Sequence, residues 1–316
     1  MKRIREKNSQ QLRASVRGSL PAIVTGTILV ILHISMAIIL GPTATEFSLA
    51  EAVGIVGFQL LVAVILVVIA LGLATRLDGK PIRAYGLESS ATWARDFLAG
   101  IAISAVGSGL AFGYLDYRGY ASISVEVSGL GVTGGPFVVS SVLVVLLGYV
   151  LANNVYEEVV FRGIMLPNFT EGLEGRGLSP TLAVVLAAVG SLFVFGLWHI
   201  PLGAGNPIPE VITSFVIGIA FTLAYLFTGR LGLPIGVHFG GVFLEGALGT
   251  SFLGLELPTL FVLEAHTTVT YEFSVVRALL VSLLVVGWVR LTYGDVRIHE
   301  AIYQSTPVRE ENSDDT

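Results

Sequence analysis

The sequence contains no cysteine among its 316 residues. It therefore has no disulfide framework, no thiol nucleophile and no cysteine-type zinc site, and any metal would need histidine and carboxylate ligands. Charged side chains are also scarce, at 13%, whereas 53% of the residues are hydrophobic and the mean hydropathy is +0.80. This balance differs strongly from that of soluble globular proteins. It predicts a chain that lies in a lipid bilayer.

A concentrated patch of positive charge is absent as well. The net charge is only -5, and the basic residues stand between apolar runs. We therefore expect no nucleic-acid partner. No internal repeat and no shift in composition separates a soluble domain from the apolar part. The expected domains are a basic cytoplasmic arm at residues 1–19, one membrane domain at 20–293 and a polar, solvated cytoplasmic tail at 294–316.

Long apolar runs dominate what is present. A window of about 20 apolar residues is long enough to cross the hydrocarbon core of a bilayer. Such windows lie near residues 20–40, 52–75, 96–115, 136–160, 180–200, 210–229, 231–254 and 273–292. The sequence thus predicts an all-α fold, a polytopic bundle of about eight transmembrane helices. Residues 122–127 alternate like a short strand, a pattern that an irregular loop would match equally well.

The Lys and Arg residues between these windows alternate along the chain. They follow the second, fourth, sixth and eighth windows, at Arg76, Lys80, Arg83, Arg95, Arg162, Arg176, Arg230, Arg290 and Arg297. The other loops carry almost none, and cytoplasmic loops are the ones enriched in Lys and Arg. We therefore expect both termini in the cytoplasm, and a multi-pass protein of the cell membrane.

The fourth window contains a polar cluster formed by Asn153, Asn154, Glu157, Glu158 and Arg162. Each ionisable group at membrane depth costs at least ~2.5 kcal/mol on insertion scales, so the cluster calls for an explanation. Glu158 and Arg162 have the four-residue spacing of a helical ion pair, with the glutamate on the favourable N-terminal side. Glu157 is turned about 100° away from Glu158 and lacks that partner. It is the carboxylate left for chemistry, although a charged helix end would give a similar pattern.

Two histidines lie in neighbouring windows. His199 ends the fifth window, and it is as far in sequence from the turn near Leu178 as Glu157 is. An antiparallel hairpin would therefore place the two residues at the same height. His238 follows the turn at Arg230 by eight residues, which corresponds to roughly 12 Å of helix. We expect all three side chains to meet in one cavity open to the cytoplasm.

This set of residues leaves two chemistries open. Without a metal, Glu157 would be the general base on water, aided by His199, while His238 would donate to the oxyanion. With a metal, Glu157, His199 and His238 would hold a divalent ion such as zinc, and Glu158 would become the base. The sequence does not choose between them, and no cofactor is certain.

Three motifs resemble those of the CPBP family of intramembrane proteases, which includes the CaaX prenyl endopeptidases and the Abi-type proteins. They are EEVVFR (Glu157 to Arg162), FGLWH (ending at His199) and the segment around His238, within residues 135–255. The resemblance implies an eight-helix fold and cleavage of membrane-anchored or prenylated peptides at the cytoplasmic surface. It also implies that Glu157 and His199 activate water, that His238 serves the oxyanion, and that Glu158 and Arg162 support them.

One residue departs from that resemblance. The third motif has Asn or Asp four residues after its histidine, where this chain has Val242. Loss of one oxyanion donor typically lowers the rate by ~10²- to 10³-fold. An alternative is therefore a weak or inactive member of the family that binds peptide or lipid as a scaffold or immunity protein. The HExxH, Gly-x-Ser-Gly and Gly-x-Gly-Asp signatures of other intramembrane proteases are absent. A transporter is disfavoured because the outer halves of most windows carry almost no ionisable group.

Overall fold

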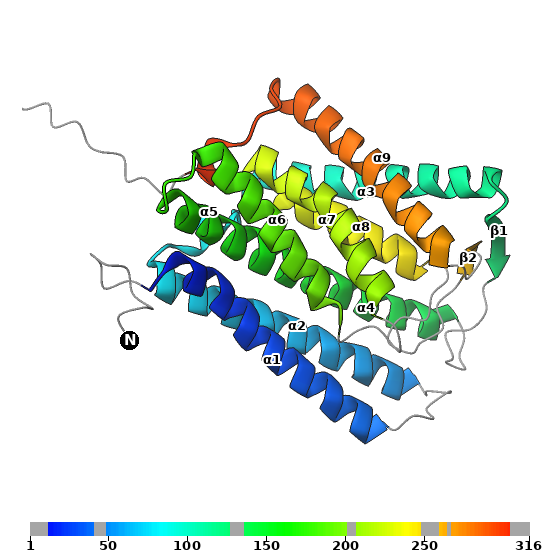
Figure 1. The fold of residues 1–316 in the computed structure, drawn as a ribbon. Coiled ribbons are helices and arrows are strands. Elements are labelled where there is room, and N and C mark those ends of the chain that lie inside the picture. Colours follow the sequence, from blue (N-terminus) through cyan, green and yellow to red (C-terminus); the bar gives the residue numbers. More distant parts are fainter. Residues whose placement is uncertain are drawn as a thin grey trace, which may run out of the picture.

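A computed structural model describes residues 12–40, 49–126, 136–200, 207–247, 259–263 and 267–303. In this part of the chain the structure is a helix bundle with one short two-stranded ribbon (Figure 1). The longer elements are α1 (Ala14–Leu40), α2 (Leu49–Asp78), α3 (Ala91–Tyr117), α4 (Pro136–Glu158), α5 (Leu166–Glu174), α6 (Pro180–Trp198), α7 (Ile208–Thr228), α8 (Gly232–Ala247) and α9 (Thr267–Tyr293). The predicted all-α fold class is confirmed.

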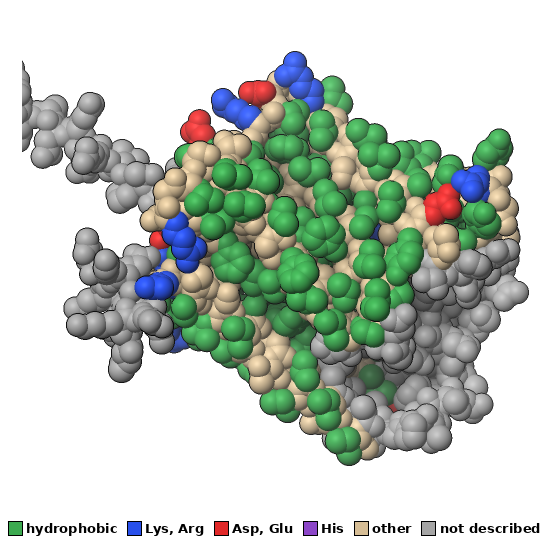
Figure 2. Space-filling model, in the orientation of Figure 1, with side chains coloured by type: hydrophobic (Ala, Val, Ile, Leu, Met, Phe, Trp, Pro, Cys, Tyr) green, Lys and Arg blue, Asp and Glu red, His purple; other side chains and the backbone are tan. Residues whose placement is uncertain are grey.

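Seven helices among the described residues are long and apolar enough to cross a membrane, with α4 and α5 counted together as one span. Hydrophobic side chains cover the flank of the bundle, and the charged side chains visible on this face gather near its ends (Figure 2). The chain is thus a multi-pass integral membrane protein. Helix α8 is the eighth apolar helix and is shorter than its predicted window, 231–254, whose last residues lie outside the described part. Short apolar helices of this kind belong in a core.

The alternating segment near residue 122 is a strand. Strand β1 (Ala121–Glu126) pairs antiparallel with β2 (Thr259–Leu263), and Ala121 lies opposite Leu263. The ribbon joins the end of α3 to the segment that precedes α9 (Figure 1). It therefore ties together two loops that are far apart in the sequence.

Helix α4 ends at Glu158, but the chain stays helical through the rest of the apolar run. Residues Val159–Met165 form a π-helical segment, and α5 continues from it to Glu174. The N–H of Leu166 bonds to the carbonyl of Phe161, which also accepts a 2.7 Å hydrogen bond from Ser191 of α6. Gly163 allows this segment to approach the backbone, since a Cβ there would lie 2.8 Å from the Tyr85 carbonyl. Such π-helical segments occur frequently at functional sites.

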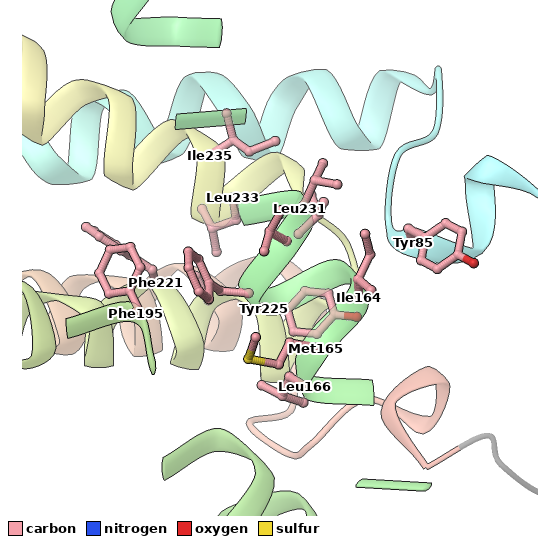
Figure 3. Packing of buried hydrophobic residues seen from close by; sticks show 14 of the residues in the cluster. Tyr85, Ile164, Met165, Leu166, Phe195, Phe221, Tyr225, Leu231, Leu233 and Ile235 are labelled. Atoms are coloured by element: carbon pink, nitrogen blue, oxygen red, sulfur yellow. The ribbon is translucent and has the colours of Figure 1, made fainter. Parts of the chain in front are cut away.

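Close packing against α3 sets the position of α8. Gly232, Gly236 and Gly240 repeat every four residues on α8, and a Cβ at Gly236 would lie 2.1 Å from the Phe97 carbonyl. Small residues at this spacing let helix backbones meet in membranes. Figure 3 shows the neighbouring apolar packing, in which Leu231 and Leu233 meet residues of the π segment and of α7.

A polar cluster lies at the end of the bundle where α1 begins, which we call the terminal cluster. It consists of Arg17, Asp78, Tyr85, Asn168 and Glu171. Asp78 accepts hydrogen bonds from Arg17 (3.1 Å), Tyr85 (3.0 Å) and Asn168 (3.1 Å). Arg17 also pairs with Glu171. Burial raises the pKa of Tyr85, so its hydroxyl remains a donor to Asp78.

The chain after α9 folds back onto the same end of the bundle. The His299 N–H bonds to the Leu226 carbonyl at 2.8 Å, and Glu300–Ile302 form a 3₁₀ turn (η4). Ile302 is buried in the main core. Within the expected solvated tail, residues 294–297 and 300–301 are exposed, whereas Ile302 is an apolar anchor that the polar composition hides. Residues 304–316 of that tail lie outside the described part.

Candidate active site

The two adjacent glutamates end α4, where the π segment begins. Glu158 is fully buried, and its Oε1 accepts hydrogen bonds from Arg162 (3.1 Å) and from His238 Nδ1 (2.8 Å). The ion pair between Glu158 and Arg162 that the spacing predicted is therefore present. The π segment carries Arg162, so the backbone irregularity and the buried charge occupy the same stretch of chain.

The charge of Arg162 is enclosed on several sides. Its Nη2 donates to the Gly218 carbonyl of α7 at 3.2 Å. The guanidinium also lies over the ring of Phe195, at 4.3 Å from the centroid, and 5.5 Å from that of Phe221. A buried ion pair is stable only where such further contacts satisfy its donors. Arg162 is thus committed to Glu158 and to α7.

Glu157 has a different set of partners. Its side chain is almost fully buried, and its Oε1 accepts a hydrogen bond from Asn153 Nδ2 at 3.0 Å. Its Oε2 lies 3.5 Å from His238 Nε2, beyond the usual hydrogen-bond range of 2.7–3.2 Å. Glu157 therefore faces an amide and a histidine, whereas Glu158 faces the arginine and the other ring nitrogen of the same histidine.

His238 bridges the two carboxylates from α8. Because a carboxylate oxygen accepts, Nδ1 carries the hydrogen that binds Glu158, and Nε2 points to Glu157. The ring stacks on Phe221, with centroids 4.3 Å apart, and meets the edge of Phe195 at 5.9 Å. Both phenylalanines belong to the apolar packing around the site (Figure 3). They hold the imidazole in one orientation.

His199 caps the C-terminal end of α6. The ring centroids of Trp198 and Tyr156, the residues just before His199 and Glu157, lie 5.8 Å apart, and Trp198 is as close to Phe161. The end of α6 therefore packs against the segment that carries Glu157. The Nδ1 of His199 donates to the Phe195 carbonyl at 2.8 Å, which leaves Nε2 as the acceptor. In the described part of the chain no hydrogen bond or ion pair joins His199 to Glu157 or His238. The ring of Phe195 contacts both histidines instead.

Sequence reasoning gave no role to the two asparagines before the glutamates. Asn153 bonds to Glu157, and the buried Asn154 links α4 to α8. In the amide orientation that satisfies both of its polar atoms, it accepts from the Phe239 N–H at 3.1 Å and donates to the Val150 carbonyl at 3.3 Å. The four-residue spacing of Asn153 and Glu157 was a readable signal.

The fit of a metal depends on which ligand atoms are available. Both ring nitrogens of His238 face carboxylates, and Nδ1 of His199 is bound to a backbone carbonyl. Among the residues that the structure describes, no three His, Asp or Glu side chains form a group that could hold a metal ion. The zinc ligand set suggested by Glu157, His199 and His238 is therefore not formed in this arrangement.

Comparison with known proteins gives one match. No curated protein and no solved structure matches the chain. A family model described as type II CAAX prenyl endopeptidase Rce1-like matches residues 139–244, which run from α4 to α8 and include every residue of the site. The resemblance seen in the three motifs is confirmed: over about a third of its length, this chain carries a domain similar to the type II CAAX prenyl endopeptidases of the Rce1-like family.

Proposed function

We propose that this chain is an intramembrane endopeptidase in which Glu157 activates water to hydrolyse peptide bonds of membrane-anchored substrates. The similarity to the Rce1-like family supports a CAAX-type protease. The observation that carries the assignment is the contrast between the two glutamates: Arg162 pairs with Glu158 and leaves Glu157 to Asn153 and His238. A general base needs such a carboxylate, since a salt-bridged one is a poor proton acceptor.

His238 is the group suited to the developing oxyanion. The 3.5 Å between His238 Nε2 and Glu157 Oε2 is too long for a hydrogen bond, so this ring nitrogen is available to contact the reacting oxygen. Glu158 orients His238 through Nδ1, and a second proton on the ring, at Nε2, would be the donor toward the site. When water attacks, Glu157 accepts its proton and His238 donates to the oxygen anion.

His199 is assigned to the water. Its Nδ1 is fixed on the Phe195 carbonyl, so Nε2 is left as an acceptor near the segment that carries Glu157. In this assignment Glu158 and Arg162 do not touch the substrate and keep His238 and the π segment in place. The expected substrate is a peptide held at the membrane by a prenyl group or another anchor. The Lys- and Arg-rich loops support a reaction on the cytoplasmic side.

The test is cleavage of prenylated and unmodified membrane-anchored peptides by the purified protein in lipid nanodiscs. Glu157→Gln should lower kcat by about 10²- to 10⁴-fold while the protein stays folded, because the amide keeps the shape and removes the base. Glu272→Gln is the matched control, since Glu272 pairs with Arg118 near the other end of the bundle. Unchanged cleavage by Glu157→Gln would contradict the assignment.

A second candidate is a binding protein on the same fold, and Val242 favours it. Position 242 lacks the polar group that the family pattern has there. In this case the wild-type protein binds the anchored peptides without cleaving them, and Val242→Asn creates cleavage. Cleavage by the wild type would reject this candidate.

A further inference from the structure

The position of Val242 in the bundle shows where its missing polar group would act. Helices α4 and α8 run antiparallel, and Glu157 on α4 lies opposite His238 on α8. Asn153 is four residues before Glu157, and Val242 is four residues after His238. Four residues make about one helical turn, so both positions lie one turn further from the terminal cluster, at the same height on facing helices.

One contact between the helices supports this alignment. Asn154, next to Asn153, reaches the Phe239 N–H, next to His238, at 3.1 Å. Asn153 itself donates to Glu157 Oε1 at 3.0 Å, within the normal hydrogen-bond range. A side-chain amide is therefore present one turn above the proposed base, although it comes from α4 and not from α8. Each amide group has two N–H donors, and the bond to Glu157 uses one of them.

We propose that Asn153 is the positioning residue of Glu157 and supplies, from α4, the amide function that Val242 lacks on α8. The proposal rests on the assignment of Glu157 as the base. The Asn153 hydrogen bond fixes Oε1 and so keeps Oε2 toward His238 and the reacting water. Rotation of the carboxylate by one rotamer would move the base away from the water, and small misplacements of this kind reduce rates on the order of 10²-fold.

The experiment compares Asn153→Ala, Val242→Asn and the double variant in nanodiscs, with kcat and KM measured separately. Asn153→Ala should lower kcat on the order of 10²-fold and leave KM unchanged, because the lost contact acts on the reacting group and not on substrate binding. Val242→Asn in the Asn153→Ala background should restore at least part of kcat. Asn168→Ala is the control, since it removes an amide in the terminal cluster. It should leave the kcat of the folded protein unchanged.

A spectroscopic readout makes the test independent of turnover. The carboxyl bands of Glu157, identified as the infrared difference between wild type and Glu157→Gln, should shift in Asn153→Ala and not in Asn168→Ala. Unchanged bands and kcat in Asn153→Ala would overturn the positioning role. A loss of kcat that Val242→Asn does not restore would overturn the replacement. Full activity of Glu157→Gln would show instead that the proposed function, and not Asn153, has been misassigned.

Discussion

Two buried ionic networks lie in the described part of this protein, and they differ in how completely their carboxylates are satisfied. In the terminal cluster, both oxygens of Asp78 have donors and Arg17 shares its charge between Asp78 and Glu171. In the site, one oxygen of Glu158 has no partner, and Glu157 faces a histidine at 3.5 Å. A network whose central carboxylate is fully satisfied fastens helices together. One with spare acceptor capacity can take up a proton, which catalysis requires.

The largest effect is expected at Arg162, which belongs to the site but whose charge serves to compensate the buried Glu158. Arg162→Met should lower the free energy of unfolding by about 3–5 kcal/mol, because Glu158 stays buried without its cation. Cleavage should also fall, since Glu158 holds His238. Unfolding in a denaturing detergent and peptide cleavage are the measurements. If Arg162→Met lowers neither the stability nor the cleavage, Glu158 has another source of charge compensation.

A substitution at Asp78 should lower stability and leave catalysis unchanged. Asp78→Ala leaves Arg17, Tyr85 and Asn168 without their common acceptor, and we expect a loss of about 3–5 kcal/mol of stability. The kcat of the protein that remains folded should not change. The exposed pair at Glu272 provides the scale, with about 0–1 kcal/mol expected for Glu272→Ala. A lower kcat in Asp78→Ala would mean that the two networks are coupled.

Gly163 lies between the two networks, on the π segment that joins them. Gly163→Ala brings a Cβ within 2.8 Å of the Tyr85 carbonyl, so the π segment or the turn at Tyr85 must shift. The expected loss of stability is about 1–3 kcal/mol. Gly109→Ala is the matched control, because a Cβ there meets nothing within 4 Å. Equal stabilities of the two variants would show that the close approach of Gly163 to Tyr85 does not constrain the fold.

The smallest effect is expected at His299, outside the membrane spans and beside the terminal cluster's end of the bundle. Burial, followed by the charge of Arg230, lowers the pKa of His299 below its ordinary value of 6.5. The folded segment therefore favours neutral His299, and its stability should decrease as the pH falls below that value, where the unfolded segment binds more protons. Hydrogen exchange at 295–303 measures this loss. It should be absent in His299→Asn, which keeps a capping acceptor but does not titrate.

Local spacing predicted the parts of the site that lie on one helix. The ion pair between Glu158 and Arg162 follows from the four-residue spacing. The hydrogen bond from His238 to Glu158 could not be derived in this way, because it depends on the rotation and depth of α8. The glycine repeat at Gly232, Gly236 and Gly240 that sets this depth was visible, but its partner on α3 was not.

Other features had no local signature. The π segment begins within an apolar run that an α-helix would fit equally well, and it exists where Arg162, Gly163 and Ser191 meet groups from other elements. Ile302 lies with Ile298 and Tyr303 in a mostly polar tail, and only their contact with the core makes them an anchor. Strand β1 had an alternating pattern, but pairing with β2 about 140 residues later decided its structure.

The sequence by itself determined that this is a multi-pass helical membrane protein, because about twenty consecutive apolar residues leave the backbone no alternative to a helix in lipid. It also indicated which charged groups call for an explanation, since a charge at membrane depth needs a partner or a purpose. Only the tertiary structure decided how Glu157 and Glu158 divide their partners. That division depends on which faces of α4, α7 and α8 meet, and those faces are chosen by packing between helices distant in the sequence.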